Sequence, residues 1–434
     1  MDDSGTLSLS RRAGGWFALG LLVAAVAGVY AQVSDGLFSA LPSHPAIEYA
    51  MRPVNDPVAA LNRKIQEGAV KLQLDGAKGS LQSVLGVLSV PIESQVVPFS
   101  KTSVQMARIT PTNPRTIFFN DSVAVGWVRG GFVELAAQDP EQGVIFYVLD
   151  PRLSEKPGFV RSDGCLTCHL SNDALGVPGM LMRSVFPGPD GTALRQLGSH
   201  VTDHRSPREE RWGGWYVTGV PGSIRHMGNA IVFDRENPES MIAERSLELE
   251  SLREKFDTDA YLSPYSDIVA LLVFEHQMHM MNLLTRVGWE TRVALHDHGT
   301  IDPRLLQDMA RELVDYLLFI DEEPLPGIVT GTSGFAEQFA AQGPYDRKGR
   351  SLRQLDLHRR MMRYPCSYMI YTEAFDKLPA EARQAIYARM WDVLSGKEQT
   401  VKYARLSVSD RKVIVEILQE TKKGLPDYFN LNTP

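Results

Sequence analysis

The chain has few cysteines, no basic run and no internal repeat or low-complexity segment. Three of its 434 residues are cysteine, and its formal net charge is -7. Without a basic run there is no reason to expect nucleic-acid binding. The composition, 44% hydrophobic and 22% charged, is that of an ordinary globular protein with room for two or three domains.

Two of the three cysteines stand three residues apart, and a histidine follows directly: Cys165-Leu166-Thr167-Cys168-His169. C-x-x-C-H is the attachment pattern of a c-type haem. Each thiol can bind one vinyl group of the same porphyrin, and the imidazole can bind the iron as an axial ligand. We therefore predict one covalent haem c. Cys366 is then left without a partner, so no internal disulfide can form and the core must hold the fold.

Two other uses of a C-x-x-C pair stay open. A zinc ribbon needs a second pair in ribbon spacing, which the chain lacks, although Cys165, Cys168, Cys366 and one histidine would make a mixed zinc site. A thioredoxin-like motif opens a helix after a strand, whereas here Gly164 and a polar turn come first. The haem interpretation is favoured over both.

The N-terminus indicates export, which covalent haem attachment in bacteria requires. Arg11 and Arg12 precede an uncharged run, residues 13–30, which ends in a small-residue cleavage pattern at Val29-Tyr30-Ala31. The run is also just long enough to cross a bilayer. We expect residues 1–31 to be a signal peptide or a membrane anchor. The globular part then lies on the periplasmic side of the bacterial cytoplasmic membrane, anchored or soluble.

The rest of the chain predicts an α+β fold with a β-rich haem-bearing N-terminal half and a mostly α-helical C-terminal half. We expect a linker over 32–55, a β-rich haem-binding region over 56–240 and an α-helical region over 241–434. Asp56 and Pro57 open a helix expected to reach Leu74. Alternating patterns predict strands at 115–120, 122–128, 132–137, 144–150, 181–186 and 215–219.

Helical patterns follow residue 240. They predict helices at 242–256, 265–287, 303–320, 334–342, 350–362, 379–395 and 408–422. The segment 265–287 is apolar on nearly all sides, which is typical of a buried central helix. On that helix Glu275, His279, Asn282 and Arg286 share one face. They form either a polar line reaching the haem or a hydrogen-bond network joining the two halves. His296 and His298 are expected in an exposed loop.

The motif makes the chain similar to cytochromes c, and more of it resembles exported bacterial cytochrome c domain-containing proteins of unsettled function. The residues that carry the likeness are the haem motif and His44–Ile47, Phe99–Thr102, Asp121–Trp127, His204–Pro207, Arg211–Trp215, Arg225–Asn229, Glu275–His279 and Arg363–Tyr368. The resemblance implies no settled reaction. In small cytochromes c the motif lies near the N-terminus of a helical domain, whereas here a sheet-like region precedes it.

A second stretch, residues 200–229, is rich in histidine and arginine. We expect the sixth iron ligand from Met227, or else from its neighbour His226, with His204 in reserve. The pair follows His169 at a distance resembling that between the two iron ligands of small cytochromes c. Arg225 beside the pair is the expected partner of a haem propionate.

These observations favour an exported single-haem cytochrome that transfers electrons between redox partner proteins. One alternative is a haem enzyme, peroxidase- or oxygenase-like, with an open distal site. Its candidate acid–base and charge-stabilising groups are His204, Arg205 and Arg211. Another alternative is a haem subunit of a membrane complex, docked through the helical half. Whether the protein is an enzyme is left open by the sequence.

Overall fold

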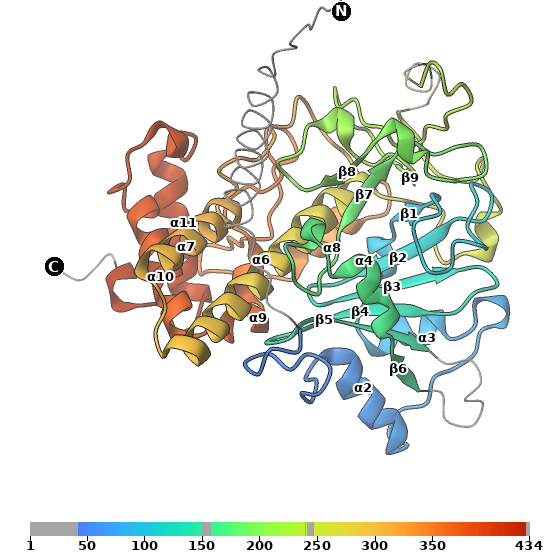
Figure 1. The fold of residues 1–434 in the computed structure, drawn as a ribbon. Helices are drawn as coiled ribbons and strands as arrows, with labels where there is room; N and C mark the ends of the chain where they lie inside the picture. The colour runs from blue at the N-terminus through green and yellow to red at the C-terminus, as the bar shows by residue number, and fades with distance from the viewer. Residues whose placement is uncertain (1–41, 150–157, 239, 241–246, 431–434) are drawn as a thin grey trace, which may run out of the picture. The chain divides into compact units, whose positions relative to one another are not determined.

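The β-branched and aromatic residues between 115 and 161 form a five-stranded antiparallel sheet (Figure 1). The computed structural model describes residues 42–149, 158–238, 240 and 247–430. The strands pair in sequence order: β2 (Arg115–Phe119), β3 (Val123–Val128), β4 (Glu134–Asp139), β5 (Gly143–Leu149) and β6 (Phe159–Arg161). The four strands predicted here are confirmed to within two residues. The three-residue β6 was not predicted, because it is too short to show an alternating pattern.

Two small antiparallel pairs flank this sheet. One joins β1 (Val97–Pro98) to β9 (Trp215–Tyr216), and the other joins β7 (Met182–Val185) to β8 (Ser199–Thr202). The predicted strand at 181–186 is confirmed, whereas the one at 215–219 is limited to two residues. Met182 faces Thr202 in the second pair. The end of β8 therefore lies beside the start of β7.

The first helix, α2 (Pro57–Gln66), begins as predicted and ends earlier. The carboxylate of Asp56 accepts hydrogen bonds from the N–H groups of Val58 and Ala59, at 2.8 and 3.0 Å. Gly68 adopts a left-handed conformation at φ 76°, and the next N–H bonds back to the Lys64 carbonyl. This Schellman arrangement terminates the helix. The expectation that it reaches Leu74 was wrong for that reason.

The long helix α6 (Ile268–His298) is the centre of the structure. Asp267 caps its first turn through the N–H of Val269 at 2.8 Å, and Gly299 ends it at φ 68°. Gly288 lies directly after the predicted end at residue 287, but it keeps a negative φ and no proline follows before Gly299, so the helix continues. His296 and His298 consequently lie in its last turn and not in a loop.

Shorter helices complete the fold. They are α3 (Leu81–Val87), α4 (Leu166–His169), α7 (Pro303–Leu317), α8 (Phe335–Ala341), α9 (Glu373–Asp376), α10 (Ala380–Leu394) and α11 (Val408–Thr421). The predictions at 303–320, 334–342, 379–395 and 408–422 are confirmed.

Two predicted helices are wrong. Over 350–362 the chain forms turns, because the carboxylates of Asp346 and Asp356 accept backbone N–H groups and compete with helix formation. Residues 247–256 also form turns, since the Leu249 carbonyl bonds to the N–H of Gly219 in another segment. The remainder of the predicted helix 242–256 lies outside the described residues.

One continuous hydrophobic core joins the sheet to the helices. Phe119 of β2 stacks on Phe274 of α6, with ring centroids 4.5 Å apart. In Figure 1 the sheet lies on one side of α6, and α7, α10 and α11 lie on the other. The predicted α+β fold class is confirmed. The predicted boundary between 240 and 241 adjoins undescribed residues and stays a prediction.

Within the described ranges no helix is long and apolar enough to cross a membrane. The predicted signal peptide or anchor, residues 1–31, lies outside those ranges.

Candidate functional site

The C-x-x-C-H motif occupies a single turn. Cys165 ends a short 3₁₀ turn, and Leu166–His169 form α4. Residues three apart on such a turn point to the same side. Cys165 is half-buried, with its thiol 3.6 Å from the Ser162 hydroxyl, and Cys168 is exposed. Both thiols are free, so one group can bond to both.

Two contacts hold the imidazole of His169 in place. Its Nδ1 lies 2.9 Å from the carbonyl oxygen of Gly179, and its ring packs on Phe146 at a centroid distance of 4.7 Å. A carbonyl can only accept, so Nδ1 carries the proton and Nε2 keeps its lone pair for a metal. Burial lowers the pKa of His169 and favours this neutral form. The motif therefore fits a haem iron.

Charged side chains surround the motif. Arg115 of β2 forms an ion pair with Glu134 of β4, and both act electrostatically on His169. Arg183 of β7 also acts on it and forms an ion pair with Asp173 at 2.5 Å. Arg183 is one-third exposed, which suits a cation that pairs with an acidic substituent. Arg183 could not be identified from the sequence, because its nearness to the motif depends on the β7–β8 pairing.

Met227 and His226, the residues predicted at the sixth iron position, are both buried. Met227 is buried in a small cluster with Leu194, and its sulfur accepts a hydrogen bond from the Ser184 hydroxyl at 3.7 Å. His226 is fully buried beside Trp212 at a centroid distance of 5.2 Å. Arg225 is exposed.

The mixed zinc site weighed from the sequence is not formed. Among the described residues, the group of three or more ligands with metal-binding spacing is His44, His296 and Asp297, and it contains no cysteine. Cys366 is fully buried in the core, whereas Cys168 is exposed.

A buried polar assembly, here called the histidine–arginine cluster, lies beside the first half of α6. Its members come from the chain after β8, from α6 and α7, and from the segment before residue 368. They are Asp203, His204, Arg205, Arg211, Glu275, His276, His279, Tyr316 and Ser367.

Two buried imidazoles and a hydroxyl form one line in this cluster. The Nδ1 atoms of His204 and His276 are 2.7 Å apart, and Nε2 of His276 is 2.7 Å from the hydroxyl of Ser367. Tyr316 stacks on His204 at 4.1 Å. Burial lowers the pKa of both histidines, that of His276 to about 3. Within the described chain Nε2 of His204 is buried without a hydrogen-bond partner, which marks a place where the cluster can accept another group.

Arg205 connects an acid and a histidine. Its Nη2 lies 2.6 Å from Asp203 and 3.0 Å from Nε2 of His279. A guanidinium only donates, so this Nε2 accepts and the proton of His279 is on Nδ1, 3.5 Å from Asp203. Burial lowers the pKa of His279 to about 4. His279 is therefore neutral with a defined tautomer.

Arg211 binds the loop after β8 to α6. It forms an ion pair with Glu275 at 2.5 Å and donates to the carbonyl oxygens of His204 and Ser206, at 2.9 and 2.6 Å. Trp212 donates to the second carboxylate oxygen of Glu275 at 3.1 Å. Burial raises the pKa of Glu275. Since Arg211 is nearly fully buried and occupied by these contacts, its role is to position the loop.

The predicted polar face of α6 links this cluster to the C-x-x-C-H motif. Asn282, seven residues after Glu275, donates to the Met180 carbonyl at 2.7 Å and accepts from the Met180 N–H at 3.1 Å. The neighbouring Gly179 is the residue that holds His169. A side chain at Gly179 would collide with the Asn282 amide. These contacts form a hydrogen-bond network that joins the two halves of the chain, which is the second of the two expectations for this face.

No family model, curated protein or solved structure matches the chain. The function therefore has to be inferred from the C-x-x-C-H motif and the residues around it.

Proposed function

We propose that this protein is an exported single-haem c-type cytochrome that transfers electrons, with haem c bound through Cys165, Cys168 and His169. The observation that carries the proposal is the hydrogen bond from Nδ1 of His169 to Gly179, beside two free thiols on one turn. When bound, the haem supplies one-electron iron chemistry. The chain fixes the tautomer and the orientation of the imidazole, and surrounds the motif with Arg115 and Arg183.

Cysteine variants test the attachment. Denaturing mass spectrometry of the full protein should give a mass one haem above that of the polypeptide. Cys165→Ser and Cys168→Ser should each lose one thioether, visible as a shift in the reduced pyridine spectrum. Cys366→Ser is the matched control and should keep the full haem mass. A bare polypeptide mass in the wild type, or a Cys366 dependence, would overturn the proposal.

For the sixth ligand we propose Met227, or else His226, with Arg225 as the partner of a propionate. Met227→Ala should abolish a sulfur-to-iron charge-transfer band and open the iron to carbon monoxide. Met309→Ala, which also truncates a buried methionine, should leave the spectrum unchanged. If Met227→Ala and His226→Ala both leave spectrum and carbon monoxide binding unaltered, neither is the ligand, and His204 becomes the candidate.

The histidine–arginine cluster favours a second candidate function, a haem enzyme with an open distal site. Its buried imidazoles, Arg205 and the unsatisfied Nε2 of His204 are groups that can move protons or stabilise charge. Arg211 is less suited, because its donors are occupied. Wild-type protein that binds cyanide or carbon monoxide without mutation would favour the enzyme, and an unreactive low-spin iron would favour electron transfer.

Location and partners follow from the proposed export. We expect the globular part in the periplasm or at the periplasmic face of the cytoplasmic membrane, together with redox partner proteins or a membrane complex. Cell fractionation and N-terminal sequencing test this, and a chain starting at Met1 in the cytoplasmic fraction would contradict it. Co-purification of a membrane complex would identify the protein as one of its subunits.

A further inference from the structure

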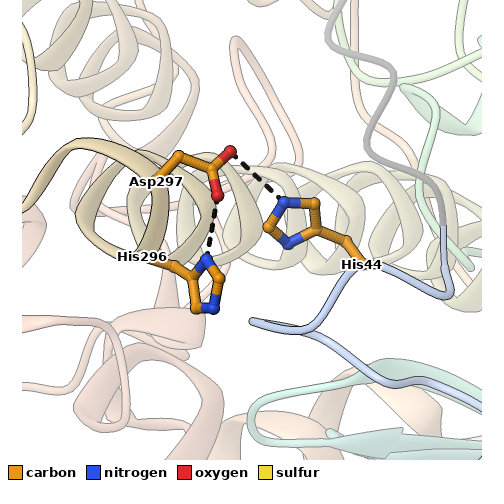
Figure 2. A group of neighbouring side chains, drawn as sticks. All are labelled: His44, His296 and Asp297. Atoms are coloured by element: carbon orange, nitrogen blue, oxygen red, sulfur yellow. Dashed lines mark hydrogen bonds and ion pairs between the residues drawn. The ribbon is translucent and has the colours of Figure 1, made fainter.

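A second group of metal-type ligands gathers at the far end of α6 (Figure 2). His296 and Asp297 lie in the last turn of the helix, and His44 lies in the N-terminal segment, 253 residues before Asp297. Nε2 of His44 is 3.3 Å from one carboxylate oxygen of Asp297, and Nδ1 of His296 is 2.8 Å from the other. One ligand atom from each residue lies within 4.8 Å of the other two.

We propose that His44, His296 and Asp297 bind one divalent transition-metal ion of the zinc type. Two imidazole nitrogens and one carboxylate oxygen are a common zinc donor set, with water in the fourth position. With bonds of about 2.0–2.1 Å, tetrahedral ligands stand about 3.3 Å apart. One ligand atom from each residue already lies within 4.8 Å of the other two, so small side-chain rotations reach that spacing.

The surroundings allow an ion to enter. The side chains of His44, Asp297 and His296 are 21%, 38% and 49% exposed. The carbonyl end of a helix carries partial negative charge, which favours a cation there. The rings of His44 and His296 meet edge to face at a centroid distance of 5.4 Å, so both can face a common point beside Asp297.

Binding requires both ligand nitrogens to give up the protons that they donate to Asp297, and it also changes the turn around His44. In the metal-free arrangement Nδ1 of His44 accepts the N–H of Ala46 at 3.2 Å, so its proton is on Nε2. An ion at Nε2 moves that proton to Nδ1, and the bond to Ala46 is lost. The turn at residues 44–46 therefore shifts when the ion binds. The bound ion then links residues 44–46 to the C-terminal turn of α6.

The test uses the haem-loaded full protein, freed of metal by a chelator and titrated with Zn²⁺ by calorimetry, and separately with Co²⁺ by absorption. We expect one ion per chain and tetrahedral d–d bands with Co²⁺. His44→Ala and His296→Ala should each weaken binding tenfold or more. His298→Ala is the matched control, since it removes an exposed histidine from the same helical turn.

Each outcome of this test either supports or overturns the proposed metal site. Equal affinity in His44→Ala and His298→Ala, or no stoichiometric uptake by the wild type, overturns the proposal. Circular dichroism of each variant confirms that its fold is intact. Because the cysteine motif is unchanged in these variants, failure of this site leaves the haem mass, and so the proposed function, untouched.

Discussion

The amide of Asn282 brackets the backbone of Met180, donating to its carbonyl at 2.7 Å and accepting from its N–H at 3.1 Å. Both groups are buried, and one residue earlier Gly179 holds the imidazole of His169. A side chain on the central helix therefore fixes the backbone segment that holds His169.

Replacing this amide should destabilise the protein. Asn282→Ala leaves two buried backbone groups of Met180 unpaired, at about 1–3 kcal/mol for each. We expect the free energy of unfolding in urea to fall by about 2–6 kcal/mol. Gln307→Ala, an exposed amide on α7, should change it by less than about 0.5 kcal/mol. Equal small effects would mean that water replaces the lost contacts.

The ion pair between Arg211 and Glu275 should be far more sensitive than a surface pair. Glu275→Gln leaves a buried guanidinium without its counter-charge, which costs about 3–5 kcal/mol. The exposed pair of Arg311 and Asp308, at 3.0 Å, gives the control. Asp308→Asn should cost about 0–1 kcal/mol. Urea unfolding of both variants measures the difference, and comparable values would show that water reaches the Arg211 site.

The buried histidines predict a loss of stability in mild acid. Burial lowers the pKa of His276 to about 3, against about 6.5 in the unfolded chain. Between these values the unfolded state binds more protons than the folded state. The free energy of unfolding is therefore highest above pH 6.5 and falls as the pH decreases towards 3. One such group contributes a slope of up to about 1.4 kcal/mol per pH unit.

Unfolding measured from pH 7 to pH 4 checks this. His276→Gln, which can still bond to Ser367, should flatten the slope, and His298→Gln at the exposed end of α6 should not. A slope unchanged by His276→Gln would mean that His276 titrates normally in the folded protein.

Counting reactive thiols gives an independent test of haem attachment. Cys366 is fully buried, and burial raises the pKa of its thiol. With haem on Cys165 and Cys168, the native protein should show no reactive thiol and the denatured protein one. Without haem, the exposed Cys168 should react in the native protein, and denaturation should reveal three. In Cys366→Ser the denatured holoprotein should show none.

Local patterns predicted much of the fold. The four longer strands of the sheet and the buried character of α6 follow from spacing and hydrophobicity alone. The errors have physical causes. Asp346 and Asp356 accept backbone N–H groups in a segment whose apolar spacing resembles a helix. The short strands β6 and β8 depend on partners that no local pattern shows.

The site residues also differ in whether a local sequence pattern shows them or whether they depend on distant partners. The haem motif is contiguous, so its residues could be read directly. His204, Arg205 and Arg211 were selected by residue type. Tyr316, which stacks on His204, is more than 100 residues away, and Ser367 joins the cluster through His276. Only the packing of α7 and of the segment before residue 368 brings these two residues to the cluster.

The burial of most of α6 also determines how the protein opens. Its central residues, from Ile268 to Thr285 with few exceptions, are shielded from solvent. The helix contacts β5 on one side and α7 to α10 on the other. Amide hydrogens at its centre should then exchange with solvent only through global unfolding. The β-rich and helical halves consequently share one cooperative transition, and a protease that separates them would leave neither half folded.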